Sequence, residues 1–203
     1  MKGCLSNVIK LVVFTLAVIG FLSIGGGDFV KTHFKDFHLF KKSQETLLDK
    51  ANKIADFTNI NTEEYEISKT ANIMGYKAVI AEHDASGQRF IVLDSGNESL
   101  LTKADFSEGR VEQKIEKLTK KLEKQFIHLE DVTITKQSSM YGIGQTIPYA
   151  RFEATPKNMP TVKKVTGIIG VFDKNGKSNV LLAVNTDGKY SQIITEQFFK
   201  DIK

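Results

Sequence analysis

The amino-acid sequence predicts an α+β protein: an N-terminal transmembrane or signal helix, followed by one antiparallel sheet of about six strands packed by about three helices. Three observations predict this fold. A charge-free apolar run precedes the first acidic residue, strand-like stretches are joined by short turn-rich connections, and amphipathic segments lie before, between and after those stretches. Consecutive hairpins require an antiparallel sheet, and amphipathic helices require a sheet face on which to bury their apolar sides.

The first element is an apolar run from Leu11 to Gly27, which follows Lys2 and Lys10 and precedes Asp28. A basic flank followed by an uncharged run is typical of targeting segments. As a helix, these residues would cover about 26 Å, slightly less than the hydrocarbon core of a bilayer. A retained anchor and a cleaved signal both fit this length, and the absence of an Ala-x-Ala cleavage pattern favours the anchor.

We therefore expect three regions: residues 1–27 as a membrane anchor or signal segment, residues 28–42 as an aromatic and basic juxtamembrane stalk, and residues 43–203 as one soluble domain. A domain of this length can bury its own core. The phenylalanines of the stalk could equally pack onto the domain. A long domain after one N-terminal signal is translocated largely regardless of charge, which predicts a domain outside the cytoplasm. Secretion after signal cleavage is the alternative localisation.

The soluble domain begins with a predicted helix over residues 44–57, which Ser43 can cap. Two strand-like stretches follow, Ile67 to Glu82 and Arg89 to Asp94, and the turn-rich residues 83–88 join them as a hairpin. The apolar positions of the helix recur at helical spacing and predict one buried face: Leu47, Leu48, Ala51, Ile54 and Ala55.

The middle of the domain contains the clearest amphipathic pattern, a predicted helix from Arg110 to Phe126. Residues 129–136 and 146–154 alternate as strands do, and Gly142 and Gly144 mark the connection between them. The apolar stripe of the helix should face the sheet: Val111, Ile115, Leu118, Leu122 and Phe126.

The last predicted strands are residues 165–172 and 179–184, on either side of Asn175-Gly176. Asn-Gly accepts positive φ readily, so this pair predicts a tight hairpin turn. A closing helix is predicted over residues 190–202, because Tyr190, Ile193, Ile194, Phe198 and Ile202 recur at helical spacing.

This order of elements resembles the PsbP-like fold over residues 62–203. The resemblance rests on a central helix, on hairpin strands around a glycine-containing turn, and on the closing helix with Tyr190, Ile193, Ile194 and Phe198. It implies an exported or membrane-associated accessory domain, a kind of domain that is often not catalytic. No family motif matched, so the resemblance assigns a function to no individual residue.

Charge and cysteine content restrict the classes of function. The formal net charge is +4, but Lys2 and Lys10 lie in the first segment, so residues 28–203 carry 26 basic and 24 acidic side chains. This near-balance offers no broad positive field to a polyanion, and nucleic acid is not an expected partner. Cys4 is the only cysteine, which excludes an intrachain disulfide and a cysteine-based zinc site.

We predict no catalytic, cofactor-binding or metal-binding residues from the sequence, and no cofactor. His83, Asp84 and Ser86 share a loop, but adjacency in sequence is not the geometry of a catalytic triad. Asp-x-Ser-Gly is ordinary turn composition, because short polar side chains cap the turning backbone. We therefore interpret this loop as a turn.

The remaining histidines also lack a recognised metal-binding spacing. Alternation along a strand would send His128 and Glu130 to one face and Asp131 to the other. His33 and His38 are five residues apart, a spacing that does not stack them on one helical face. Neither group forms a recognised ligand set.

Three further patterns have ordinary explanations. The glycines at 25–27 and 142–144 do not lie between a strand and a helix in a phosphate-binding pattern. Asn97-Glu98-Ser99 matches a glycosylation acceptor, which often arises by chance. Five lysines make one side of the central helix basic, and the interspersed glutamates favour a solvated face over an anion-binding one: Lys114, Lys117, Lys120, Lys121 and Lys124.

From these observations we expect a membrane-anchored extracytoplasmic binding or accessory domain without catalysis. Its expected partners are the membrane, through residues 11–27, and an envelope protein. Two alternatives remain: a hydrolase with an unrecognised site near His83 or His128, and a carrier of an apolar ligand between sheet and helices.

Overall fold

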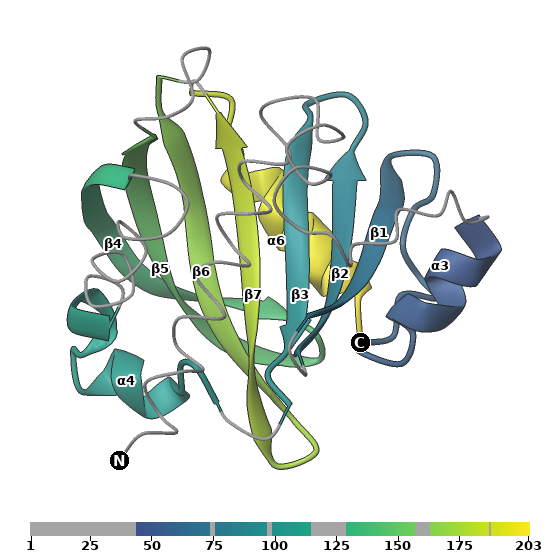
Figure 1. Ribbon diagram of the computed structural model, residues 1–203, viewed down its shortest axis with the longest axis horizontal. Coiled ribbons are helices and arrows are strands. Elements are labelled where there is room, and N and C mark those ends of the chain that lie inside the picture. Colours follow the sequence, from purple (N-terminus) through teal and green to yellow (C-terminus); the bar gives the residue numbers. More distant parts are fainter. Residues whose placement is uncertain (1–43, 74–75, 97–98, 115–128, 157–162, 187) are drawn as a thin grey trace.

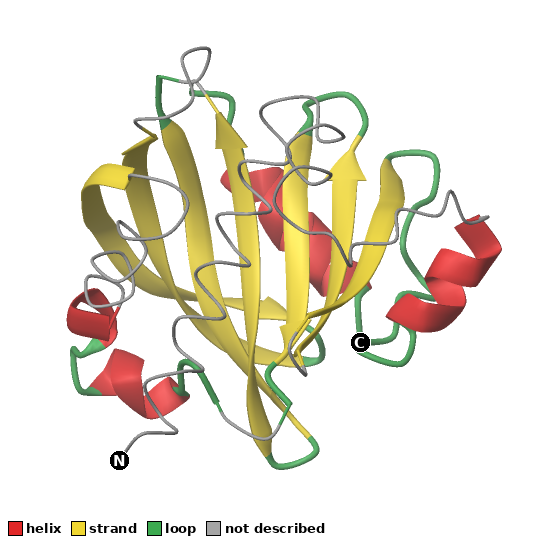
Figure 2. Ribbon diagram, viewed as in Figure 1, coloured by secondary structure: helices red, strands yellow, loops and turns green. Residues whose placement is uncertain are grey.

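The computed structural model describes residues 44–73, 76–96, 99–114, 129–156, 163–186 and 188–203. Seven strands form one antiparallel sheet in the order β1-β2-β3-β7-β6-β5-β4 (Figure 1). The strands are β1 Tyr65–Ile73, β2 Tyr76–His83, β3 Gln88–Asp94, β4 Leu129–Gly142, β5 Gln145–Pro156, β6 Val165–Lys174 and β7 Lys177–Thr186. In the described ranges the helices are few and short (Figure 2): α3 Gln44–Ala51, α4 Lys103–Ser107 and α6 Gln192–Asp201.

This architecture is α+β-like, but it corrects the predicted fold class. The sheet has seven strands rather than six, because the stretch from Ile67 to Glu82 is not one strand. Ile73 pairs with Tyr76, so the chain reverses between them, and β1, β2 and β3 form a meander. The sheet dominates the fold, whereas we had predicted a larger share of helix; α3, for example, ends at Ala51 instead of residue 57.

The predicted N-terminal helix lies outside the part of the chain that the structure describes. No helix in the described ranges is long and apolar enough to cross a membrane. Residues 11–27 and the predicted stalk at 28–42 lie outside those ranges. Most of the predicted helix from Arg110 to Phe126 also lies outside them, although residues 111–114 are helical and Val111 is fully buried.

Both faces of the sheet are buried at its central strands, which explains why β6 and β7 are nearly continuous apolar runs instead of alternating ones. The first face, called here the α6 face, packs its side chains against α6 and the α3 region. The opposite face packs against the crossover segment between β3 and β4, through Leu100, Leu101 and Val111. Alternation along each strand therefore assigns every side chain to one face or the other.

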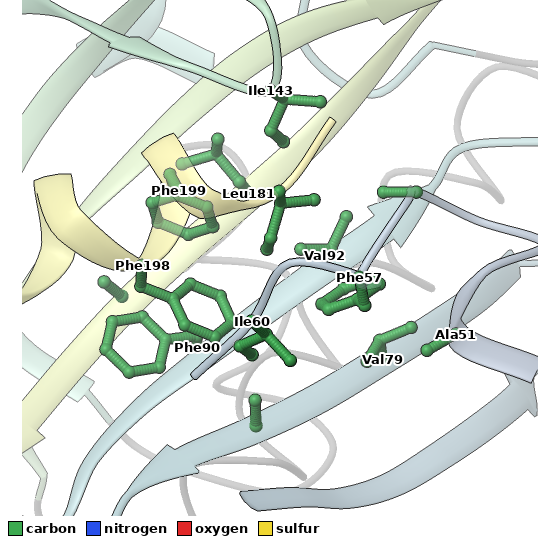
Figure 3. Packing of buried hydrophobic residues seen from close by; sticks show 14 of the residues in the cluster. Ala51, Phe57, Ile60, Val79, Phe90, Val92, Ile143, Leu181, Phe198 and Phe199 are labelled. Atoms are coloured by element: carbon green, nitrogen blue, oxygen red, sulfur yellow. The ribbon is translucent and has the colours of Figure 1, made fainter. Parts of the chain in front are cut away.

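Aromatic side chains dominate the core on the α6 face. Phe198 of α6 stacks on Phe90 of β3 with ring centroids 4.0 Å apart, and Phe199 approaches Phe90 edge-on at 5.9 Å (Figure 3). Phe57 and Val92 lie in the same cluster (Figure 3). Such pairs add about 0.5–1.5 kcal/mol each beyond the burial of apolar area, so they fix α6 firmly on the sheet.

The crossover from β3 to β4 is held by one buried carboxylate. Asp105 of α4 is fully buried, and its Oδ2 accepts hydrogen bonds from the backbone N–H and the hydroxyl of Thr102, both at 2.9 Å. Arg110 and Lys114 pair with the same carboxylate. Burial alone would raise the pKa of Asp105, but these donors outweigh it and hold the pKa below its usual range. Lys114, which we expected on a solvated helix face, is thus an ion-pair partner of a buried carboxylate.

Candidate functional site

A half-buried arginine, Arg151 of β5, is the starting point of the candidate site. Tyr149 belongs to the cluster on the α6 face, whereas Ala150 and Phe152 belong to the opposite one, so alternation places Arg151 on the α6 face. Its guanidinium carbon lies 5.2 Å from the centroid of the Tyr190 ring. This distance is within the range of a cation–π interaction, which holds the guanidinium over the ring.

Tyr190 is a rigid platform for that arginine. Its hydroxyl donates to Gln192 Oε1 at 2.9 Å, and it lies 3.1 Å from Thr195 Oγ1. Burial raises the pKa of Tyr190 to about 12. The phenol is therefore neutral at physiological pH, and the ring presents an uncharged face to Arg151.

A buried glutamine fixes the position of this platform. The side-chain amide of Gln88, on β3, donates to Ser191 O at 3.0 Å and to Thr195 Oγ1 at 2.8 Å. Its oxygen accepts the Ser191 N–H at 2.7 Å. All polar atoms of a fully buried side chain are thus satisfied by the first turn of α6, which ties the segment carrying Tyr190 to the centre of the sheet.

Lys136 of β4 completes the cationic pair because of an irregularity in its strand. The register shifts between Ile134 and Lys136, so Thr135 is an inserted bulge residue and Lys136 lies opposite Arg151. From Lys136 to Gly142 the pairing is regular, and Met140 belongs to the cluster on the α6 face; Lys136 therefore shares that face with Arg151. β-Bulges commonly re-aim a side chain in this way beside functional sites.

The electrostatics of this pair differ from those of Arg89 and Lys103. In the described ranges neither Arg151 nor Lys136 forms an ion pair, whereas Arg89 is paired with Glu82 and Lys103 with Asp173. Like charges directly opposite each other on neighbouring strands repel. Glu196 of α6 accepts a hydrogen bond from Gln192 and contributes to the raised pKa of Tyr190, but it pairs with neither cation. The site therefore retains a positive charge, and it can bind an oxyanion through the donors of Arg151 and Lys136.

The structure explains the loop that contains His83, Asp84 and Ser86. Ser86 Oγ lies 2.9 Å from His83 Nδ1, which also accepts the Ser86 N–H at 3.2 Å. The Asp84 N–H donates to Glu64 O, and within the described residues the Asp84 carboxylate makes no hydrogen bond to His83. These contacts stabilise the turn between β2 and β3, in agreement with our interpretation of the loop.

Gly142 and Gly144 lie at the turn between β4 and β5, on either side of Ile143. Gly142 pairs with Gln145, and Ile143 and Gly144 have φ values of 49° and 67°. The pattern of positive φ at both central residues is that of a type I′ hairpin.

Several other candidates lie outside the described residues. These are His33, His38, His128, the glycines at 25–27, most of the basic face of the central helix, and Asn97-Glu98 of the glycosylation pattern. Glu130 and Asp131 belong to β4, but their side chains are not among those described. Among the side chains that are described, no group of three or more potential ligands is placed to hold a metal ion.

The sequence reasoning did not identify Arg151, Lys136 or Tyr190 as a group. One signal was present: residues 135–139 are uniformly polar in the middle of a strand, Thr-Lys-Gln-Ser-Ser, and they are exposed. Nothing in the sequence shows that a bulge shifts Lys136 onto the face of Arg151, because that depends on the register with β5.

Comparison with known proteins found no matching family and no matching curated protein. The resemblance to the PsbP-like fold therefore stays a prediction.

Proposed function

We propose that this protein is a non-catalytic binding module that recognises an oxyanion-bearing ligand at Arg151 and Lys136. The observation that carries the proposal is the half-buried guanidinium of Arg151, which is stacked on Tyr190 and lies opposite Lys136. No carboxylate in the described part of the chain pairs with either cation. An oxyanion bound between them would replace a cross-strand repulsion by two attractive contacts.

The expected gain in binding is moderate. A hydrogen bond to a charged group contributes about 1.5–3 kcal/mol, and part of that contribution offsets the loss of ligand freedom. The cation–π contact and the Gln88 network hold Arg151 and its platform in place before the ligand arrives, which reduces the entropy lost on binding. A single oxyanion should therefore bind weakly, and a larger ligand that contains one should bind more tightly.

The charge states at the site support binding over acid–base catalysis. Arginine stays protonated at all physiological pH values, and the Tyr190 pKa of about 12 keeps that phenol neutral. General acid–base catalysis works best with a group whose pKa lies near the operating pH. The groups that line this site are suited to hold charge instead of moving protons.

The packing on the α6 face also bears on the apolar-carrier alternative. The space between α6 and β3 is filled by the stacked rings of Phe90 and Phe198, and Phe199 closes against them. A carrier needs room for a ligand between its layers. This packing favours the binding of a ligand at the polar margin of the sheet, where Arg151 and Lys136 lie.

The location proposed for this module is outside the cytoplasm, attached to the membrane, with an envelope protein as its partner. This part of the proposal rests on the sequence pattern of Lys2, Lys10 and residues 11–27 alone. A reporter fused after Lys203 should be active only outside the cytoplasm. Activity confined to the cytoplasm would refute the location without touching the binding site.

Binding of an oxyanion is tested on the full chain in detergent micelles by NMR, with sodium glutarate and sodium sulfate as probes. Glutarate should shift the Arg151 Nε–H and Lys136 N–H signals saturably in the wild-type protein. In the Arg151→Gln variant the Lys136 signal should no longer shift saturably with glutarate. In Arg89→Gln, at an arginine already paired with Glu82, both signals should still shift saturably. Equal binding by wild type and Arg151→Gln, or no saturable shift with either probe, would show that the proposed site does not bind oxyanions.

A further inference from the structure

Within the described sheet, β4 is an edge strand, and it carries Lys136 of the cationic pair. It is 14 residues long, it is terminal in the sheet order, and its only strand partner in the described sheet is β5. Residues 135–139 are exposed regardless of the face on which they lie. An edge strand of this kind offers unpaired backbone groups to another chain.

The hairpin turn determines which backbone groups are open. Gly142 and Gln145 close a two-residue turn, and the pairing continues without a shift back to Lys136 and Arg151. The residue pair that closes such a turn exchanges hydrogen bonds, and alternate residues along the strand then point their N–H and C=O groups outward. Gln137, Ser139 and Tyr141 are these alternate residues, and the Tyr141 side chain is 62% exposed.

The cationic pair lies in one row that runs across the sheet. Arg151 on β5 and Lys136 on β4 occupy neighbouring positions of that row. A further strand placed beside β4 would put its own residue next to Lys136 on the α6 face, within reach of Arg151. An aspartate or glutamate at that position could pair with both cations.

We propose that the ligand is an acidic extended segment of another protein, which adds to the β4 edge and places a carboxylate against Lys136 and Arg151. This inference rests on the proposed function, because it names the ligand that the oxyanion site recognises. Backbone hydrogen bonds to Gln137, Ser139 and Tyr141 supply affinity, and the carboxylate supplies selectivity.

Charge complementarity favours this occupant over two others. A second copy of the chain would bring its own Lys136 to the same edge, and lysines and bulges on edge strands oppose pairing between identical edges. A free phosphate cannot make the backbone hydrogen bonds that an added strand makes with the β4 edge, whereas a carboxylate on such a strand reaches the row of Lys136 and Arg151 together with them.

The experiment uses the full chain and three fluorescein-labelled peptides of alternating threonine and valine, identical except for a central glutamate, glutamine or lysine. Affinity is measured by fluorescence anisotropy. The glutamate peptide should bind about tenfold more tightly than the glutamine peptide, and the lysine peptide should bind least. Arg151→Gln should reduce the affinity for the glutamate peptide to that for the glutamine peptide. Arg89→Gln should leave the ratio of these two affinities unchanged.

A second variant separates strand addition from simple anion binding. Ser139→Pro removes an outward N–H and retains the pairing of β4 with β5, since proline is tolerated on edge strands. It should abolish peptide binding and leave the glutarate shifts of Arg151 intact. A glutamate peptide that binds no better than the glutamine peptide, or one that still binds Ser139→Pro, would overturn the inference while glutarate binding sustains the proposed function. A dimer that Ser139→Pro dissociates, without peptide binding, would assign the edge to a second copy.

Discussion

Two hairpin turns at the same end of the sheet have the same backbone shape but different origins. In the β6–β7 turn the central residues are Asn175 and Gly176, with φ of 54° and 72°; in the β4–β5 turn they are Ile143 and Gly144, with φ of 49° and 67°. Asparagine adopts positive φ readily, whereas a β-branched residue there costs roughly 1–2 kcal/mol. The first turn is favoured by its own residues, and the second needs support from elsewhere in the fold.

That support comes from α6. The Ile143 N–H donates to Phe199 O at 2.7 Å, and the Ile143 side chain is buried in the cluster on the α6 face (Figure 3). Burying an isoleucine stabilises by about 1.5–3 kcal/mol, which exceeds the conformational cost of its positive φ. Tertiary packing therefore imposes a turn that local preference opposes, and the two hairpins should respond differently to substitution.

The largest expected effect comes from removing the residue that supports the β4–β5 turn. Phe199→Ala should lower the free energy of unfolding by about 3–5 kcal/mol, because it removes a fully buried ring from the cluster in which the Ile143 side chain is buried. Ser178→Ala, which removes a hydrogen bond to Asp173 beside the other turn, should cost about 1 kcal/mol. Urea denaturation followed by circular dichroism measures both, and similar costs would contradict the difference between the turns.

A smaller effect is expected from adding one methyl group beside each turn. A Cβ at Gly142 would lie 2.9 Å from both Cβ and O of Phe199, so Gly142→Ala should destabilise by about 2–3 kcal/mol. A Cβ at Gly176 would meet nothing within 4 Å, so Gly176→Ala should cost only the strain of its positive φ, about 1 kcal/mol. Thermal unfolding compares the two variants. If Gly176→Ala lost more stability than Gly142→Ala, α6 would not be packed tightly against the β4–β5 turn.

Exchanging the turn residues tests the comparison directly. Ile143→Asn introduces the residue that the turn geometry prefers but removes a buried side chain, so we expect a net loss of about 1–2 kcal/mol. Asn175→Ile introduces strain of about 1 kcal/mol at an exposed position without a packing gain. If Ile143→Asn instead stabilised the protein in chemical denaturation, the local preference would outweigh the packing.

The smallest expected effect concerns the polar link between the turns. The side-chain amide of Gln145 exchanges two hydrogen bonds with the backbone of Asp173. Lys103 Nζ contacts both residues, at 2.9 Å from Gln145 Oε1 and 3.0 Å from Asp173 Oδ2. Both charged side chains are largely exposed, so Lys103→Ala should cost only about 0.2–1 kcal/mol at pH 7. If Lys103→Ala lowered the free energy of unfolding by more than this amount, the polar link, and not α6, would be the main support of the β4–β5 turn.

The same link should weaken in acid. Partial desolvation raises the pKa of Asp173, but donors from Lys103 and Ser178 outweigh it and hold the pKa below its usual range. A folded-state pKa below the unfolded one means that the stabilisation is present above about pH 4 and is lost as the pH falls through the folded value. The difference in free energy of unfolding between wild type and Lys103→Ala should therefore shrink at low pH. If urea denaturation instead gave the same difference across that pH range, the Lys103–Asp173 ion pair would not be the source of the difference.

These two turns also show how far the sequence predicts the structure. Asn175-Gly176 predicted its turn because the signal is local, and the closing helix, predicted over 190–202, is confirmed as α6 at Gln192–Asp201. The connection at Gly142 and Gly144 was located correctly, but the strands around it were predicted too short. Residues 137–141 pair with β5 although they are mostly polar and exposed, and no periodicity reveals such an edge.

The candidate site was beyond the reach of the sequence for the same reason. Arg151 and Lys136 become neighbours only through the register of β4 and β5, and Tyr190 approaches them from a segment far along the chain. Gln88 fixes that segment across more than one hundred residues. Contacts of such separation leave no mark on local residue patterns.

The position of β7 between β3 and β6 affects the order in which the protein can fold. The meander β1–β2–β3 is synthesised early, but its inner edge finds its partner only when β7, near the other end of the described chain, has been made. Pairings between such distant segments fold slowly, because a long loop must close first. During synthesis the inner edge of β3 therefore stays without its native partner, and exposed to pairing with other chains, until β7 has been made.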